Sequence, residues 1–89
     1  MNKHETHPEI INRLKRASGH LQKVVEMIEK GKGCLEVAQQ LQAVSNAISN
    51  AKQIYVEDHI EHCIEAAENM DKKIISKKIN ELKKIAKYL

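Results

Sequence analysis

The stretch CLEVAQQLQAVSNAISNAKQIYVEDHIEHCIEAAE, residues 34–68, decides the fold of this chain. It contains neither glycine nor proline, the two residues that most often interrupt a helix. Its apolar residues recur at steps of three and four, which is the period of a helix with one buried face. The stretch therefore predicts a single helix that is longer than usual for a globular domain. The residues expected on its buried face are Leu41, Val44, Ile48, Ala51 and Tyr55.

The residues before this stretch predict a first helix. It is expected to begin at about Pro8, with Thr6 and Glu9 at the spacing of a capping box, and to end at the KGKG stretch, residues 30–33. His7 is interpreted as part of the helix start, and His4 as a solvent-exposed residue. The expected buried face contains Ile10, Ile11, Leu14, Ala17, Leu21, Val24, Val25 and Ile28.

A third helix is expected after Asn69 and Asp71, running from about Asp71 to Tyr88. It would bury Ile75, Ile79, Leu82, Ile85, Ala86 and Leu89. No segment shows the pattern of a strand, so we expect an all-α fold with one domain, residues 1–89, and a long central helix. Of the 89 residues, 42% are hydrophobic but only 2% are aromatic, which is thin for a self-sufficient core. An oligomer is therefore expected.

Several classes of protein are disfavoured. No apolar run approaches the roughly 18 residues of a membrane span, and MNKHETHPE is not a secretory signal, so we expect a cytoplasmic protein with no membrane partner. Paired catalytic carboxylates, a phosphate-binding glycine loop and a nucleophile with its base are missing, so neither an enzyme nor a small-molecule substrate is expected. In a reducing compartment the two cysteines are better suited to metal or redox chemistry than to a disulfide.

Cys34, His59 and Cys63 share one stripe of the central helix. At 100° per residue, His59 lies about 20° to one side of Cys34 and Cys63 about 20° to the other. Cys34 and His59 are nevertheless about 38 Å apart along a straight helix, so they cannot meet within one chain. If two copies pair antiparallel with Ile48 near the crossing, Cys34 of one copy arrives beside His59 and Cys63 of the other. Such a dimer would carry two equivalent sites.

The donor set of two thiolates and one imidazole suits Cu(I), and it is one ligand short of the four that structural zinc usually takes. The alternative interpretation is two small buried hydrophobic residues and a histidine that is satisfied by hydrogen bonds. His62 points about 80° away from Cys34, so it is interpreted as a surface residue or one that supports a ligand.

The stretches HPEIINRLKRASGHLQKVVEMIE, CLEVAQQLQAV and EDHIEHC together resemble the copper-sensing operon repressor (CsoR) family. The resemblance implies a three-helix protomer, an antiparallel four-helix bundle as dimer, and commonly a homotetramer built as a dimer of dimers. It also implies that the metal-free protein binds double-stranded operator DNA and that Cu(I) releases it.

Cu(I)-sensing members of that family carry Cys, His and Cys at the positions of Cys34, His59 and Cys63. Glu81 matches a glutamate that supports the histidine in those members, whereas Gly33 stands where they often have a tyrosine.

The net charge of +3 conceals a strong asymmetry. Residues 34–71 contain one basic and seven acidic side chains, and residues 72–89 contain seven basic and one acidic. The lysines of the last helix are interpreted as a solvated face. The first helix has the only arginine-containing cluster, and arginine suits phosphate contacts. In relatives, basic residues at the position of Arg13 and in the middle of the second helix are linked to DNA binding. In that helix Ser45, Asn50 and Gln53 stand where relatives often carry basic residues, which leaves Lys52 alone. The predicted DNA contacts are Arg13, Lys15, Arg16 and Lys52.

Two other functions use the same residues. A persulfide- or electrophile-sensing repressor would use Cys34 and Cys63 as a dithiol pair between subunits, with His59 activating a thiol. A copper buffer or chaperone would bind the metal without a role on DNA.

Overall fold

The computed structural model of the protein describes residues 6–67 and 71–89. These residues form the helices α1 (His7–Glu29), α2 (Cys34–Ala67) and α3 (Lys72–Ile85), followed by the short 3-10 helix η1 (Ala86–Tyr88). Over the same residues no strand is formed. The predicted all-α protomer with a long central helix is therefore confirmed, while Asn69 lies outside the described residues.

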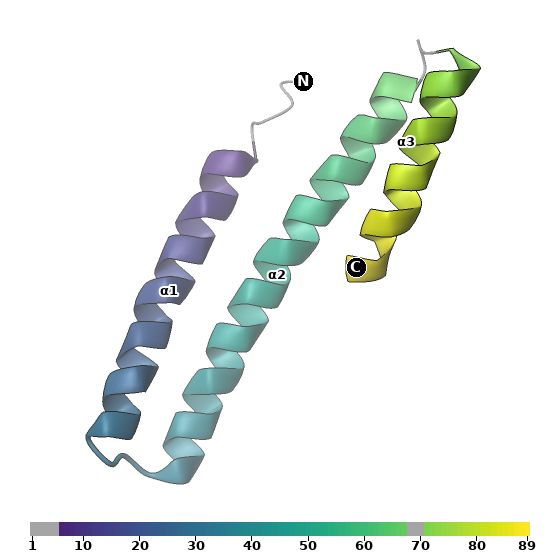
Figure 1. Ribbon diagram of the computed structural model, residues 1–89. Coiled ribbons are helices and arrows are strands. Elements are labelled where there is room, and N and C mark those ends of the chain that lie inside the picture. The colour runs from purple at the N-terminus through teal and green to yellow at the C-terminus, as the bar shows by residue number, and fades with distance from the viewer. Residues whose placement is uncertain (1–5, 68–70) are drawn as a thin grey trace.

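The helices α1 and α2 run antiparallel as a hairpin (Figure 1). Gly31 ends α1 with a φ of 73°, a left-handed conformation that glycine adopts at little cost. The N–H of Lys32 bonds to the carbonyl of Met27 at 3.0 Å and that of Gly31 to Ile28 at 3.1 Å, which is the Schellman pattern. The break predicted at residues 30–33 thus has a defined stereochemical cause.

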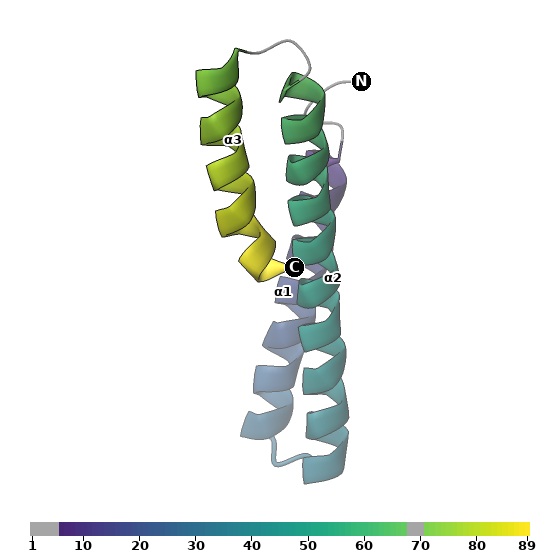
Figure 2. The same ribbon diagram turned by 90° about the vertical axis from the view of Figure 1, so that its right-hand side faces the viewer.

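The helix α3 returns along the C-terminal half of α2 (Figures 1 and 2). Asp71 precedes it in an extended conformation, and its carboxylate accepts a hydrogen bond from the N–H of Ile74 at 3.0 Å. This contact is a standard N-cap, and it fixes the point at which α3 starts. The short helix η1 then carries the C-terminus to the middle of α2 (Figure 1).

The capping box predicted at the start of α1 is wrong. Thr6 has a helical backbone, φ −83° and ψ −18°, and its side chain makes no capping hydrogen bond. A capping residue normally has an extended backbone, so in this helical geometry the Thr6 hydroxyl does not cap the N–H groups of the first turn. Glu9 does not reach back either, because its carboxylate pairs with Arg13 at 3.0 Å. Over the described residues, the Thr6 Oγ1 is a buried oxygen without a hydrogen-bond partner.

The core of the protomer contains fewer buried apolar residues than the sequence predicts. The buried apolar residues are Ile10, Ala17 and Val24 of α1 and Val44, Ala51, Val56 and Cys63 of α2. The remaining apolar residues of the predicted α1 face are 42–58% exposed. The protomer is elongated, 59 × 24 × 14 Å, and α1 and α3 cover only part of α2 (Figures 1 and 2). This arrangement leaves apolar surface on α1 and α2 exposed.

The predicted burial of α3 is also wrong for the single protomer. None of its described residues is buried, and Ile75, Leu82 and Ile85 are only half-buried. Ile79 is 46% exposed, and Leu89 beyond the helix is 60% exposed. The reason is that α3 packs against α2 alone, so only one edge of its apolar face is covered.

The cap at Asp71 predicts a measurable contribution to stability. Asp71→Ala should lower the free energy of unfolding by about 1 kcal/mol, because the first turn of α3 loses its acceptor. Asp71→Asn keeps an acceptor and should retain most of that stability. Urea unfolding at one fixed protein concentration measures both values. Equal losses in the two variants would contradict the assignment of the cap.

Candidate metal centre

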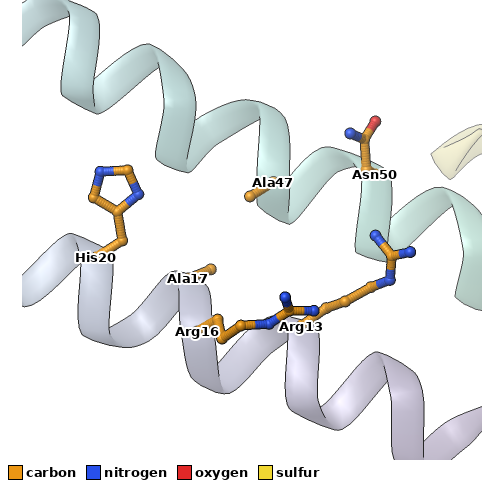
Figure 3. Close-up of a pocket in the computed structure, with 6 residues that line it drawn as sticks. All are labelled: Arg13, Arg16, Ala17, His20, Ala47 and Asn50. Atoms are coloured by element: carbon orange, nitrogen blue, oxygen red, sulfur yellow. The ribbon is translucent and has the colours of Figure 1, made fainter.

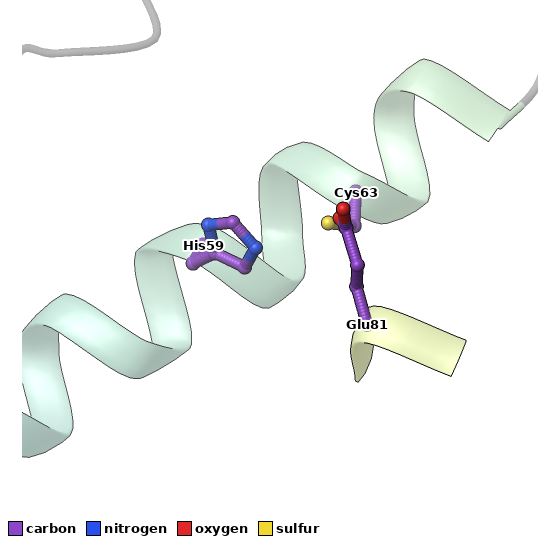
Figure 4. A group of neighbouring side chains, drawn as sticks. All are labelled: His59, Cys63 and Glu81. Atoms are coloured by element: carbon purple, nitrogen blue, oxygen red, sulfur yellow. The ribbon is translucent and has the colours of Figure 1, made fainter. Parts of the chain in front are cut away.

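Three potential metal ligands converge where α3 lies against α2 (Figure 4). His59 and Cys63 are one helical turn apart on the same face of α2, and Glu81 reaches them from α3. One ligand atom from each residue lies within 4.8 Å of the other two. The return of α3 along α2 therefore assembles a nitrogen, a sulfur and an oxygen donor from residues far apart in the sequence.

The surroundings of the three donors differ. Cys63 is buried, His59 is half-buried, and the Glu81 side chain is 56% exposed, with its carboxylate 3.8 Å from the Lys78 ammonium. A shallow pocket of about 330 Å³ opens beside His59. It is lined by His59, Glu81, Lys84, Ile85 and Tyr88. The thiol thus faces the interior of the protomer, while the imidazole borders a pocket open to solvent.

Cys34 is not part of this group within one protomer. It is the first residue of α2 and is exposed, whereas Cys63 lies near the other end of the same unbroken helix. At 1.5 Å per residue, Cys34 and His59 are separated by about 38 Å.

The donors that one protomer brings together differ in the metals they prefer. The Cys63 thiolate and the His59 imidazole suit a soft ion such as Cu(I), and the Glu81 carboxylate suits harder divalent ions. A set with two thiolates needs a cysteine from another chain.

A basic pocket lies at the centre of the α1–α2 hairpin (Figure 3). Its volume is about 280 Å³, and Arg13, Arg16 and His20 of α1 line it opposite Ala47 and Asn50 of α2. The His20 Nε2 is 2.6 Å from the Gln40 Oε1, which holds that ring between the helices. Two guanidinium groups and a ring nitrogen in one concavity can bind an anion such as a phosphate.

The predicted DNA contacts are divided between this pocket and the open surface. Arg13 and Arg16 line the pocket together, whereas Lys15 and Lys52 are exposed and do not. Arg13 is paired with Glu9 at 3.0 Å, but the two side chains are 38% and 60% exposed, and such solvent-accessible pairs are weak enough for a phosphate to displace.

The sequence predictions missed two residues of the basic pocket. His20 follows Arg16 by four residues on α1, so helical spacing alone could have placed it beside the arginines. Asn50 lies on the facing helix, and its place in the pocket depends on how α1 and α2 pack.

A comparison with protein families matches residues 6–88 to the model of the metal-sensitive transcriptional repressors. The copper-sensing transcriptional repressor CsoR of Mycobacterium ulcerans is 39% identical over 57 residues, which are 64% of this chain and 49% of that protein. CsoR of Bacillus subtilis is 36% identical over 56 residues, which are 63% of this chain and 55% of that protein. The chain thus aligns with only about half the length of these curated relatives.

Among solved structures, the nickel-responsive transcriptional regulator InrS has a similar fold. It superposes with a TM-score of 0.80 at 30% sequence identity, and the match covers 92% of this chain and 91% of that one. The relatives therefore include proteins named for copper and for nickel. Over the residues described, no helix combines the length and apolarity that crossing a membrane requires.

The position of Glu81 predicts a difference between metals. Glu81→Gln should leave the affinity for Cu(I) nearly unchanged, because a carboxylate is a poor ligand for that ion. The affinity for Zn²⁺ or Ni²⁺ should fall by about 10- to 100-fold. Competition with chelators of known affinity measures both. Glu57→Gln is the control, since Glu57 is exposed on α2 and bonds to Gln53. A fall in Cu(I) affinity as large as that for Zn²⁺ would contradict this division of roles.

Proposed function

Because the chain belongs to the metal-sensitive transcriptional repressor family, we propose that it is a Cu(I)-responsive repressor. In this proposal residues 1–89 form one domain that both senses the metal and binds DNA in the cytoplasm. The metal-free protein binds double-stranded operator DNA, and Cu(I) binding releases it. The observation that carries the proposal is the pairing of His59 and Cys63 on one face of α2, with Cys34 on the same stripe near its other end.

The second half of the site would come from another copy of the chain. Leu41 and Ile48 are each 43% exposed and Tyr55 is 47% exposed, all on the apolar face of α2 that its own protomer leaves open. An antiparallel pairing about Ile48 would cover this face and bring Cys34 to the His59–Cys63 pair of the partner. The resulting four-helix bundle contains two identical sites, and a homotetramer would join two such dimers.

The donor chemistry favours Cu(I) over nickel as the signal. Two thiolates and an imidazole form a soft set, and three ligands are sufficient for Cu(I). Glu81 would support the site from α3, where it lies against His59 and Cys63. With ligands from two chains, the affinity for the metal depends on the quaternary arrangement. A ligand that prefers one arrangement shifts the population away from the other, and about 1–3 kcal/mol of coupling changes DNA affinity about 5- to 150-fold.

The basic pocket is the proposed centre of the DNA surface. Arg13 and Arg16 would contact phosphates there, with Lys15 and Lys52 contributing from the exposed surface around it. The acidic composition of residues 34–71 leaves α1 as the main source of positive charge on this hairpin. Phosphate contacts of this kind release counterions, so binding should weaken steeply as salt rises.

The release of DNA by copper is the first prediction. Anaerobic fluorescence anisotropy on the upstream promoter fragment should show a tight complex of the metal-free protein that dissociates when Cu(I) is added. Cys34→Ala should bind DNA equally well but no longer respond, because the site loses its ligand from the other chain. Ser45→Ala, a substitution on the same helix, is the control and should respond normally. Tight binding that copper does not affect would contradict the proposal and favour a persulfide or electrophile sensor with Cys34 and Cys63 as its dithiol pair.

The role of Arg13 gives a second prediction. Arg13→Ala should weaken DNA binding. The logarithm of the affinity should also fall less steeply with the logarithm of the salt concentration, by about one unit of slope for each protomer on the DNA. The affinity for Cu(I) should stay nearly the same, since Arg13 is remote from His59 and Cys63. Lys30→Ala removes an equal charge at the far end of α1 and should have little effect. An unchanged salt slope in Arg13→Ala would exclude Arg13 from the phosphate contacts.

A further inference from the structure

The basic pocket between α1 and α2 has the features of a site for a small anion. Its volume of about 280 Å³ is just below the roughly 300–1,000 Å³ of most small-molecule sites. Arg13, Arg16 and His20 follow one another at steps of three and four residues, so they occupy one face of α1. Ala17 and Ala47 line the same space between the helices, and their short side chains leave room for a ligand (Figure 3).

The positive charge of this pocket is only partly neutralised by the protein. Among the described residues, none that lines the pocket is acidic. The surrounding part of α2, residues 37–56, contains no aspartate or glutamate and one lysine. Arg13 has its exposed pair with Glu9, whereas over the described residues Arg16 makes no ion pair. An anion in the pocket would therefore supply the negative charge that the neighbouring side chains do not.

His20 can bond to such an anion through its Nδ1. Its Nε2 lies 2.6 Å from the Oε1 of Gln40, which does not line the pocket. An amide oxygen can only accept a hydrogen bond, so this contact makes Nε2 the donor and leaves Nδ1 for a ligand. In the neutral ring Nδ1 accepts from the hydroxyl of a hydrogen phosphate, and in the protonated ring it donates to a phosphate oxygen.

The pocket opens away from the surface that is proposed to pair with a second copy. Asn50, which lines the pocket from α2, follows Ile48 by two residues. At 100° per residue, the two side chains point about 160° apart around the helix. Because Ile48 lies at the centre of the proposed pairing, the pocket remains accessible to a ligand in the dimer.

We propose that this pocket binds a free phosphate group, carried by inorganic phosphate or by the phosphate monoester of a small metabolite. Arginine binds phosphate oxygens through two parallel hydrogen bonds, and the Asn50 amide can donate a further one from α2. Among the described residues, the lining includes no Phe, Tyr or Trp on which a nucleobase could stack. The phosphate itself is therefore the group that is recognised. Its binding does not depend on copper, whereas its competition with DNA rests on the proposed function.

The test compares inorganic phosphate with chloride at equal ionic strength, on the full metal-free chain without DNA. Phosphate should shift the NMR signals of the His20 ring and of the Arg13 and Arg16 side-chain N–H groups until the site is saturated, and chloride should not. Glycerol phosphate is titrated in the same way. Saturable binding of either compound supports the proposal, and the one that binds more tightly identifies the class of ligand.

The nearly isosteric variant Asn50→Asp places a negative charge opposite the two arginines. It should lower the affinity for phosphate by about tenfold or more, and so should Arg16→Gln, which removes a charged donor. Asn46→Asp is the matched control. Asn46 lies one turn earlier on α2, bonds to Gln42 and does not line the pocket, so this variant should bind phosphate as the wild type does. Circular dichroism confirms that each variant remains helical.

The proposal is overturned if phosphate and chloride act alike at equal ionic strength, or if Asn50→Asp and Asn46→Asp bind phosphate equally well. DNA binding is measured separately by anisotropy in a buffer without phosphate, so the two proposals can fail independently. If the chain binds DNA, added phosphate should weaken that complex more than chloride does at equal ionic strength. An equal effect of the two anions would contradict the competition.

Discussion

The length of α2 is the constraint on which the other features depend. Its 34 residues extend about 51 Å, whereas the 23 residues of α1 and the 14 of α3 extend about 35 and 21 Å. The two shorter helices lie beside α2 without enclosing it (Figures 1 and 2). Because α1 and α3 cover only part of α2, a residue such as Ile48 stays 43% exposed in its own protomer. Both the stability and the function of this protein are therefore expected to depend on its assembly into an oligomer.

The length of α2 also separates the potential metal ligands from the basic pocket. Soft donors occur near both ends of α2, while the basic pocket lies between α1 and α2 in the middle of the hairpin (Figure 3). In the proposed dimer, a metal ion would connect the end of one α2 to the beginning of the other. A small change in how the two copies of α2 cross would then alter the spacing of both basic pockets, which are the proposed contacts to DNA.

Local signals predicted most of the secondary structure, and packing explains where they failed. Gly31 ended α1, because the left-handed backbone there favours glycine, and Asp71 starts α3, because its carboxylate caps the first turn. The Thr6 cap failed because the chain enters α1 with a helical backbone. Periodicity identified the apolar faces, but it could not show that α3 packs against one helix only. The prediction that the chain is not an enzyme is confirmed by its membership of a repressor family.

For the candidate sites, helical spacing placed His59 beside Cys63, and the family resemblance selected Glu81. The position of Asn50 opposite Arg13 and Arg16 could not be predicted, because it depends on the register of α1 against α2.

The shallow docking of α3 has a consequence for the speed of metal exchange. Cys63 is buried, yet the described residues of α3 that lie over this part of α2 include none that is buried. An element held by so little apolar contact detaches at a small fraction of the free energy of global unfolding. Brief detachment would expose the thiol to a metal donor while the α1–α2 hairpin stays folded. In the proposed function, a metal ion would enter and leave by this route without the chain unfolding, at a rate set by how firmly the Asp71 cap and the apolar edge of α3 hold that helix in place.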